Sequence, residues 1–364
     1  MAGLADTIEM LTHAARQHPA PRPNEPPAPH LVETAASGAD PGRLRMLSYV
    51  PEGLAPGAPL VVALHGCWHG AAEFDRGTGW SALARRHGFA LLLPEQRSVN
   101  NAQGCFNWFE PGHAARDKGE AAGIRAMVER MIEDHALDRG RVFVTGLSAG
   151  GAMAAALLAS YPEVFAAGAV IAALPYGAAT GLSGAIEAMY HGRIRPAREW
   201  GETVRRATAH GGPWPRLQVW HGTADTTVVP ANADELVKQW RDLHGLAPAP
   251  DAAGRVDGAA YQGWFGPDGT PLLESYLVPG LSHVVPIAPN APEVEHRHGV
   301  AGSCAQDAGI ASTCHIARFW GLTGESLPAR VQAHAPGASV PEAGFPASFD
   351  PMVWASSLFG ARPF

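Results

Sequence analysis

The sequence predicts an α/β protein with a mainly parallel central sheet and helices on both of its faces. Short apolar runs of strand length alternate with helical patterns through the middle of the chain. Strands that alternate with helices of about 10–15 residues indicate βαβ units, in which the strands run parallel. The chain also contains 42 glycines and 32 prolines, well above average usage. So many turn-forming residues argue for a compact fold of many elements and exclude a coiled coil.

The expected elements follow one another between residues 43 and 320. Strands are expected at 43–50, 60–64, 89–93, 142–145, 168–173 and 217–221. Helices are expected at 80–87, 118–135, 149–161 and 231–244. Later in the chain, two strand-like runs within 261–278 flank a Gly-Pro-Asp-Gly sequence that is typical of a hairpin turn, and 310–320 has a helical pattern.

Charge and hydropathy argue against a nucleic-acid-binding protein and against a membrane-spanning one. The formal net charge is −7, and Lys118 and Lys238 are the only lysines, so the chain has no basic run that could bind phosphates or an anionic surface. No uninterrupted apolar stretch approaches the roughly 18–20 residues that a membrane span needs. We therefore expect neither a nucleic-acid partner nor a membrane span.

Residues 141–153, RVFVTGLSAGGAM, carry the strongest single signal. They place Gly-x-Ser-x-Gly, centred on Ser148, between an apolar strand and a helix of small residues, which is the context that this motif requires. Ser148 would sit on a strained turn that side chains in place of the two glycines would obstruct. Residues 181–183 and 280–282 repeat the first half of the motif but lack the closing glycine. The segment therefore predicts Ser148 as the nucleophile of an α/β-hydrolase rather than a structural turn serine.

Asp225 is the candidate acid. A serine nucleophile needs a histidine to take its proton and a carboxylate to orient that histidine. In α/β-hydrolases the acid follows the nucleophile along the chain, and Asp225 comes just after the apolar run 217–221 and Gly222. The alternative role is an aspartate that only caps an Asx turn. The competing aspartates lie in a helical pattern or in glycine-rich turns: Asp234, Asp242, Asp251, Asp257 and Asp268.

His283 is the candidate base among 17 histidines. It follows the strand-like run 274–278 and the turn 279–282, so we expect it in a loop at the carboxyl end of a strand. His221 precedes the acid by too few residues to serve as the base, and His244 ends a helical pattern.

Two other segments imitate functional sites. Residues 293–298, EVEHRH, have the composition of a metal site. Their spacing fits neither ligands at i and i+4 on one helix face nor a cysteine-containing zinc pattern, so we expect a solvated loop and no metal. His210-Gly211-Gly212 imitates an oxyanion segment, but it follows the nucleophile, and a turn is the better interpretation.

Acyl transfer also needs two N–H donors for the oxyanion. One would come from Ala149, directly after the nucleophile, and the second from the loop after the apolar run 60–64, where we assign the backbone N–H of Cys67. Further on, the loop 103–109 is rich in aromatic residues. It suits a pocket wall, with a plain packing role as the alternative.

At these positions the sequence resembles the polyhydroxybutyrate depolymerase family of serine esterases, whose neighbours are the feruloyl and acetylxylan esterases. The resemblance spans about residues 45–321. It is carried by LHGC at 64–67, PEQ at 94–96, CFNWF at 105–109, GEA at 119–121, GLSAGGAM at 146–153, LPYG at 174–177, WHGTAD at 220–225, GLSH at 280–283 and IARFWG at 316–321.

The resemblance implies the α/β-hydrolase fold, an ester or polyester substrate and no cofactor. It implies Ser148 as nucleophile, Asp225 as acid and His283 as base, with the oxyanion bound by the N–H groups of Cys67 and Ala149. Five side chains are candidates for substrate binding: Trp68, Asn107, Trp108, Tyr176 and Trp220. Trp68 departs from the family, which usually has a small polar residue there, and this departure could reshape the acyl pocket.

The four cysteines leave two disulfides and four thiols both open. The candidate pairs are Cys67–Cys105 and Cys304–Cys314. The first 20 residues include Asp6 and Glu9 where a secretory signal has cations and an apolar core. This start favours a cytoplasmic location, while secreted members of the family leave export open. The oligomeric state is also open.

Three regions are expected: a Pro/Ala-rich arm at 1–42, an α/β-hydrolase catalytic domain at 43–322, and an irregular tail at 323–364. Within the domain, 181–210 is a candidate helical cap over the site. From the length of this tail we expect no separate polymer-binding domain of the kind found in family members that degrade crystalline polyester.

Three functions are weighed. The first is a carboxylic ester hydrolase that acts on polyhydroxyalkanoate esters, their oligomers or related polyesters. The second is a feruloyl or acetylxylan esterase, which an aromatic wall of Trp68, Phe106 and Trp108 would suit. The third is a binding module without catalysis, and three catalytic groups in the correct chain order argue against it.

Overall fold

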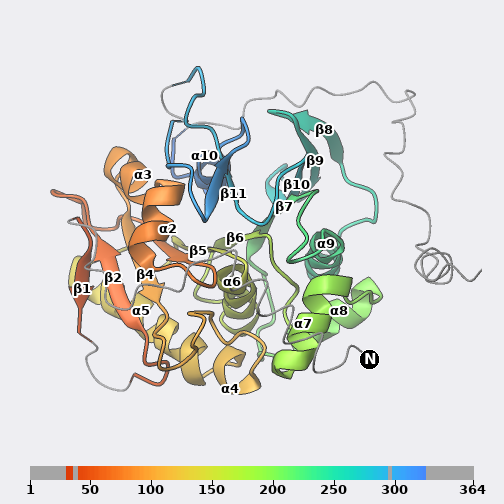
Figure 1. Cartoon of the computed structure of the whole chain (residues 1–364), viewed down its shortest axis with the longest axis horizontal. Helices are drawn as coiled ribbons and strands as arrows, with labels where there is room; N and C mark the ends of the chain where they lie inside the picture. The colour runs from red at the N-terminus through yellow and green to blue at the C-terminus, as the bar shows by residue number, and fades with distance from the viewer. Residues whose placement is uncertain (1–29, 36–39, 294–296, 325–364) are drawn as a thin grey trace, which may run out of the picture.

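A ten-stranded sheet crosses the whole molecule in the computed structural model (Figure 1). The structure describes residues 30–35, 40–293 and 297–324. The order of the strands is β1-β2-β4-β3-β5-β6-β7-β10-β9-β8. Most of the expected arm (1–42) and all but two residues of the expected tail (323–364) lie outside the described residues.

The six central strands run parallel, as expected. They are β3 (Leu60–Leu64), β4 (Ala90–Glu95), β5 (Val142–Leu147), β6 (Ala167–Ile171), β7 (Arg216–Gly222) and β10 (Pro271–Val278). Antiparallel strands extend both edges: β1 (Val32–Thr34) and β2 (Arg45–Tyr49) on one side, β9 (Ala259–Phe265) and β8 (Ala252–Val256) on the other. The expected hairpin joins β9 to β10.

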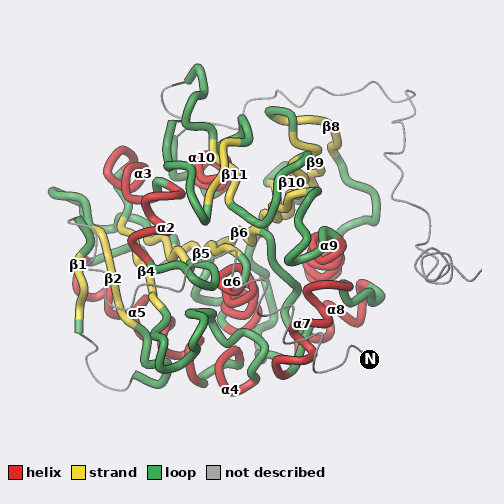
Figure 2. Tube along the Cα trace, in the orientation of Figure 1, coloured by secondary structure: helices red, strands yellow, loops and turns green. Residues whose placement is uncertain are grey.

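Helices cover both faces because successive strand residues point in opposite directions. Leu60 and Val62 belong to one apolar core, and Val61 belongs to the other. The first core includes residues of α4 (Pro111–Ala114), α5 (Gly119–His135), α6 (Ala149–Ser160), α8 (Ala197–Arg205) and α9 (Ala231–His244). The second includes α2 (Ala71–Thr78), α3 (Trp80–His87) and α10 (Ser312–Phe319) (Figure 2).

The expected strands and main helices are confirmed to within a few residues, and the differences occur where the pattern is weak. Val32–Thr34, inside the expected arm, forms β1 on the sheet edge, with the neighbouring Leu31 only 5% exposed. β8 consists mostly of small residues, is half-exposed, and lacks a clear alternation of apolar and polar side chains. Two three-residue strands, β11 (Val285–Ile287) and β12 (Ala305–Asp307), form a separate small sheet.

Residues 181–210 hold two helices, α7 (Gly181–His191) and α8. α7 packs with a third, smaller apolar cluster that includes Leu174 and Trp200. Among the described residues, no helix combines the length and apolar character needed to cross a membrane.

Candidate active site

Ser148 occupies a sharp turn between β5 and α6. Its backbone has φ 56° and ψ −119°, a conformation that non-glycine residues rarely adopt. A Cβ on Gly146 would lie 2.4 Å from the backbone of Gly150, and a Cβ on Gly150 would lie 2.4 Å from the carbonyl oxygens of Leu64 and His65. Gly146 is therefore required for the turn to close on itself, and Gly150 is required for it to pack against the end of β3.

Ser148 meets two residues that lie far away in the chain. His283 Nε2 is 2.8 Å from Ser148 Oγ, and His283 Nδ1 is 2.7 Å from Asp225 Oδ2. The three side chains follow β5, β7 and β10, which are parallel strands of one sheet. Their carboxyl ends therefore meet at the same edge, and the structure brings all three predicted residues together.

Asp225 is both a turn aspartate and the partner of the imidazole. Its Oδ1 accepts the backbone N–H groups of Thr227 and Val228, each at 2.9 Å, while Oδ2 faces His283. Burial opposes ionisation of this carboxyl. Its hydrogen bonds with His221 and His283 outweigh burial and hold the pKa of Asp225 well below its usual range. The two interpretations of Asp225 from the sequence are thus compatible.

Two candidate oxyanion donors follow the neighbouring strands β3 and β5. Ala149 is the first residue of α6, where an N–H group has no acceptor within the helix. Cys67 lies in the turn after β3, and its N–H donates to no acceptor in the described part of the chain. The next donor, Trp68 N, is already bound to Gln103 O at 2.8 Å. The assignment of Cys67 and Ala149 as the two oxyanion donors stays a prediction.

His65 holds the Gly66–Cys67 peptide in place. Its Nε2 accepts the N–H of Gln96 at 3.1 Å, so Nδ1 carries the proton and donates to Gly66 O at 2.8 Å. Burial lowers the pKa of His65, which favours the neutral imidazole that this arrangement needs.

A disulfide joins Cys67 to Cys105, with 4.2 Å between the Cα atoms. It ties the turn after β3 to the aromatic loop. The other candidate pair is wrong: Cys304 and Cys314 are not joined but remain as two buried thiols within the second apolar core. Burial raises the pKa of Cys304 to about 12, so this thiol stays protonated.

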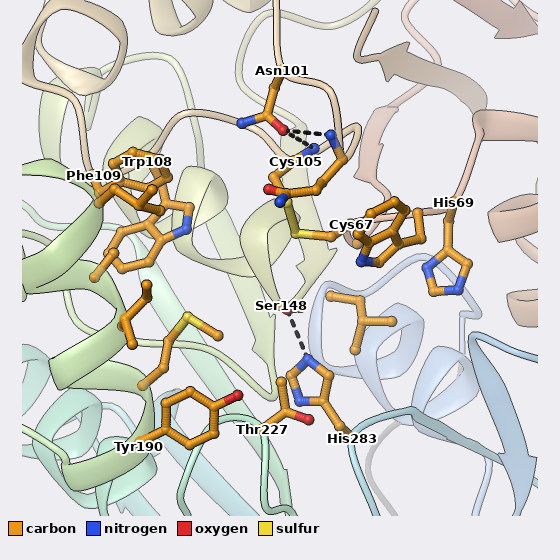
Figure 3. A pocket seen from close by; sticks show the side chains of 18 of the residues that line it. Cys67, His69, Asn101, Cys105, Trp108, Phe109, Ser148, Tyr190, Thr227 and His283 are labelled. Atoms are coloured by element: carbon orange, nitrogen blue, oxygen red, sulfur yellow. Dashed lines mark hydrogen bonds between the residues drawn. A yellow bond between two sulfur atoms is a disulfide. The ribbon is translucent and has the colours of Figure 1, made fainter. Parts of the chain in front are cut away.

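A cavity of about 370 Å³ opens over Ser148 (Figure 3). Trp68 and Trp108 line it, as expected, and α7 supplies much of one wall. The lining residues are Gly66, Cys67, Trp68, His69, Asn101, Gln103, Cys105, Trp108, Phe109, Leu147, Ser148, Leu182, Ala185, Ile186, Met189, Tyr190, Thr226, Thr227 and His283.

Three of the expected substrate-binding residues lie elsewhere. Trp220 is fully buried and stacks on Tyr276 with 4.0 Å between ring centres. The alternation of side chains along β7 directs it into the second apolar core rather than toward the cavity. Asn107 is buried and donates to Glu120 Oε1 at 2.5 Å, so it anchors the aromatic loop. Tyr176 packs against the first apolar core.

The aromatic wall also differs from the expectation. Phe106 is buried, with 4.9 Å between the centre of its ring and that of His65, whereas Phe109 lines the cavity.

The described residues contain no group of three histidine, cysteine or acidic side chains that could hold a metal ion.

The fold and the site define an α/β-hydrolase. A solved acetyl xylan esterase from Aspergillus awamori superposes with a TM-score of 0.64 at 26% identity, covering 70% of this chain and 93% of that one. The family model described as "Esterase PHB depolymerase" matches residues 44–260. The chain belongs to this family, and it is a carboxylic ester hydrolase.

Two relatives show the range of the family. Poly(3-hydroxyalkanoate) depolymerase C of Paucimonas lemoignei is 41% identical over 295 residues, which are 81% of this chain and 70% of that protein. Feruloyl esterase B of Thermothelomyces thermophilus is 35% identical over 256 residues, which are 66% of this chain and 87% of that protein.

Proposed function

We propose that Ser148, His283 and Asp225 are the catalytic triad of this ester hydrolase, and that its substrates are esters and short oligomers of 3-hydroxyalkanoates. The single observation that carries the triad is the continuous chain of hydrogen bonds from Ser148 Oγ through His283 to Asp225, at 2.8 and 2.7 Å. This chain allows the imidazole to accept a proton while the carboxylate stabilises the resulting cation.

Acylation begins when Ser148 Oγ attacks the ester carbonyl carbon and His283 Nε2 takes the hydroxyl proton. The carbonyl oxygen becomes an oxyanion, which the N–H groups of Cys67 and Ala149 bind. Each such donor is worth about 2.7–4 kcal/mol in other serine hydrolases. The bond to the alcohol then breaks, and His283 gives its proton to the departing oxygen. Water, deprotonated by His283, attacks the acyl-enzyme, releases the acid and restores Ser148.

The pocket supports a short aliphatic hydroxyacyl substrate. Leu182, Ile186 and Met189 of α7 give the cavity an apolar wall. A cavity of about 370 Å³ lies at the small end of ligand pockets. The similarity to poly(3-hydroxyalkanoate) depolymerase C supports the hydroxyalkanoate class.

A second candidate is hydrolysis of feruloyl or acetyl esters of polysaccharides. Trp68, Trp108 and Phe109 all line the cavity, and aromatic rings of this kind can stack on a phenolic acyl group. The similarity to feruloyl esterase B supports this alternative.

A labelling experiment and a substrate panel test the proposal. A fluorophosphonate should label the protein at Ser148, and Ser148→Ala should abolish both labelling and hydrolysis. Rates would then be compared for ethyl 3-hydroxybutyrate, a 3-hydroxybutyrate dimer, methyl ferulate and acetylated xylo-oligosaccharides. Label at another residue would contradict the triad. Hydrolysis of ferulate or acetyl esters alone would replace the first substrate class by the second.

We propose that the protein works in an oxidising compartment rather than in the cytoplasm. The Cys67–Cys105 disulfide supports this placement, because structural disulfides are rare in proteins of the reducing cytosol. When the protein is purified without a reductant and then denatured, a thiol titration should detect two free thiols, those of Cys304 and Cys314.

A further inference from the structure

Two hydroxyl groups line the pocket together with His283, and we propose that they form a subsite for the alcohol part of the substrate. Tyr190 belongs to α7, and Thr227 follows Asp225 in the loop after β7. Their O–H groups bind a carbonyl oxygen that the leaving alcohol carries. This subsite rests on the proposed function and deepens it, because it selects esters in which the alcohol is itself a hydroxy acid.

The alcohol part of an ester must lie on the His283 side of the breaking bond. The imidazole that contacts Ser148 Oγ at 2.8 Å is the group that returns the proton to the departing oxygen. Thr227 is fixed on this side, because its backbone N–H donates at 2.9 Å to Asp225 Oδ1. The other carboxylate oxygen, Oδ2, orients His283. The same loop therefore positions both the acid and the Thr227 side chain.

Neither hydroxyl group has a hydrogen-bond partner within the described part of the protein. Tyr190 Oη and Thr227 Oγ1 make no hydrogen bond to any residue that the structure describes, and both side chains are half-buried. Figure 3 shows the Tyr190 hydroxyl directed toward Thr227 and His283. Hydroxyl groups in a partly desolvated pocket that lack a protein partner are available to a ligand.

The chemistry of a hydroxyalkanoate oligomer matches this pair. When a dimer is cleaved, the leaving alcohol is a 3-hydroxyacyl unit, and its carbonyl group lies two carbon atoms from the carbon that bears the new hydroxyl. Two O–H donors can satisfy the two lone pairs of that carbonyl oxygen. The remainder of the α7 wall is apolar, with Ile186 and Met189, which suits the alkyl branches of the chain. A simple alkyl alcohol has no oxygen to offer to the subsite.

The test compares two esters with the same acyl part. Ethyl 3-hydroxybutyrate has a plain alcohol, whereas the methyl ester of the 3-hydroxybutyrate dimer has an alcohol that carries a carbonyl. The kcat/KM ratio of dimer to ethyl ester should fall about fivefold in Tyr190→Phe and in Thr227→Val, and more than about tenfold in the double variant. Tyr49→Phe is the matched control, since it removes a tyrosine hydroxyl on β2, outside the pocket, and its ratio should equal that of the wild type.

The outcomes separate the subsite from the proposed function. If the wild type cleaves both esters and the double variant keeps the same ratio, the subsite is overturned while the proposed function stands. An equal fall in activity on both esters also overturns it, because that result indicates a displaced His283 rather than lost recognition. If the wild type cleaves neither ester, the proposed function fails, and the subsite falls with it.

Discussion

His221 Nε2 lies 3.3 Å from Asp225 Oδ2, the same oxygen that contacts His283. It also lies 2.8 Å from the carbonyl oxygen of Val228. Two acceptors face Nε2, so this nitrogen carries the proton, and the buried His221 ties both ends of the acid loop to β7. We interpret His221 as a positioning residue for Asp225.

The first prediction concerns this contact. His221→Phe keeps the shape of the ring but removes the donor, so Asp225 should lose orientation. We expect kcat to fall about tenfold, with KM changed less than about threefold. Gln can still donate to Val228 O, and His221→Gln should recover part of the loss. Equal kcat values in the wild type and both variants would show that His221 only fills space.

The second prediction is the dependence of stability on pH. The folded-state pKa of Asp225 is lowered relative to an unfolded value of about 3.9. The unfolded state therefore binds the proton more readily, and the stabilisation is present above this value and lost as the pH falls below it. Urea unfolding between about pH 5 and pH 2, at roughly one-unit steps, should show a shallower loss of stability for Asp225→Asn than for the wild type. Identical slopes would contradict the lowered pKa.

The third prediction tests the turn at Ser148. A Cβ on Gly146 would lie 2.4 Å from Gly150 backbone atoms, which cannot move aside as a flexible side chain can. Gly146→Ala should destabilise the protein by about 1–3 kcal/mol or more and abolish fluorophosphonate labelling. Gly112→Ala is the control, because its Cβ would meet no atom within 4 Å. Thermal unfolding and labelling measure both effects, and a fully labelled, stable Gly146→Ala would refute the steric argument.

The fourth prediction concerns the disulfide. Cys67–Cys105 closes a sequence separation of 38 residues and holds the turn that carries the proposed oxyanion donor Cys67 N–H. Its loss should cost about 2–4 kcal/mol of stability and lower kcat more than it raises KM. Dithiothreitol should reproduce the effect of the Cys67→Ser/Cys105→Ser double variant and have no further effect on that variant. Unchanged kcat after complete reduction would separate the disulfide from catalysis.

The positions of the chemical groups could be predicted because each follows an apolar strand. Ser148 and Asp225 follow strands that were expected to run parallel, and His283 follows a strand-like run of the expected hairpin. In the structure all three strands, β5, β7 and β10, run parallel and end at one edge of the sheet. Trp220 was assigned wrongly, although alternation along the strand already separates it from Val219: the two residues belong to opposite cores.

The wall formed by α7 could not be deduced in the same way. Residues 181–191 have a weak pattern of small and apolar residues, and which face covers the pocket depends on how the helix packs on Leu174 and Trp200. Tyr190 was missed for this reason, whereas Thr227 was missed because attention in the loop after β7 went to Asp225 alone. A tyrosine within an apolar helical stretch, and a threonine two residues after the acid, are the signals that could have found them.

The register of two strands has a consequence for how this enzyme can change. Leu64 on β3 is paired with Gly146 on β5, and Cys67 and Ala149 each come three positions later. The two proposed oxyanion donors therefore follow neighbouring strands that end in register, about 4.8 Å apart across the backbone ladder. Insertions in the loops beyond these positions can reshape the pocket wall while the two strand ends keep their spacing. We therefore expect that new acyl specificities can evolve without changes at the reaction centre.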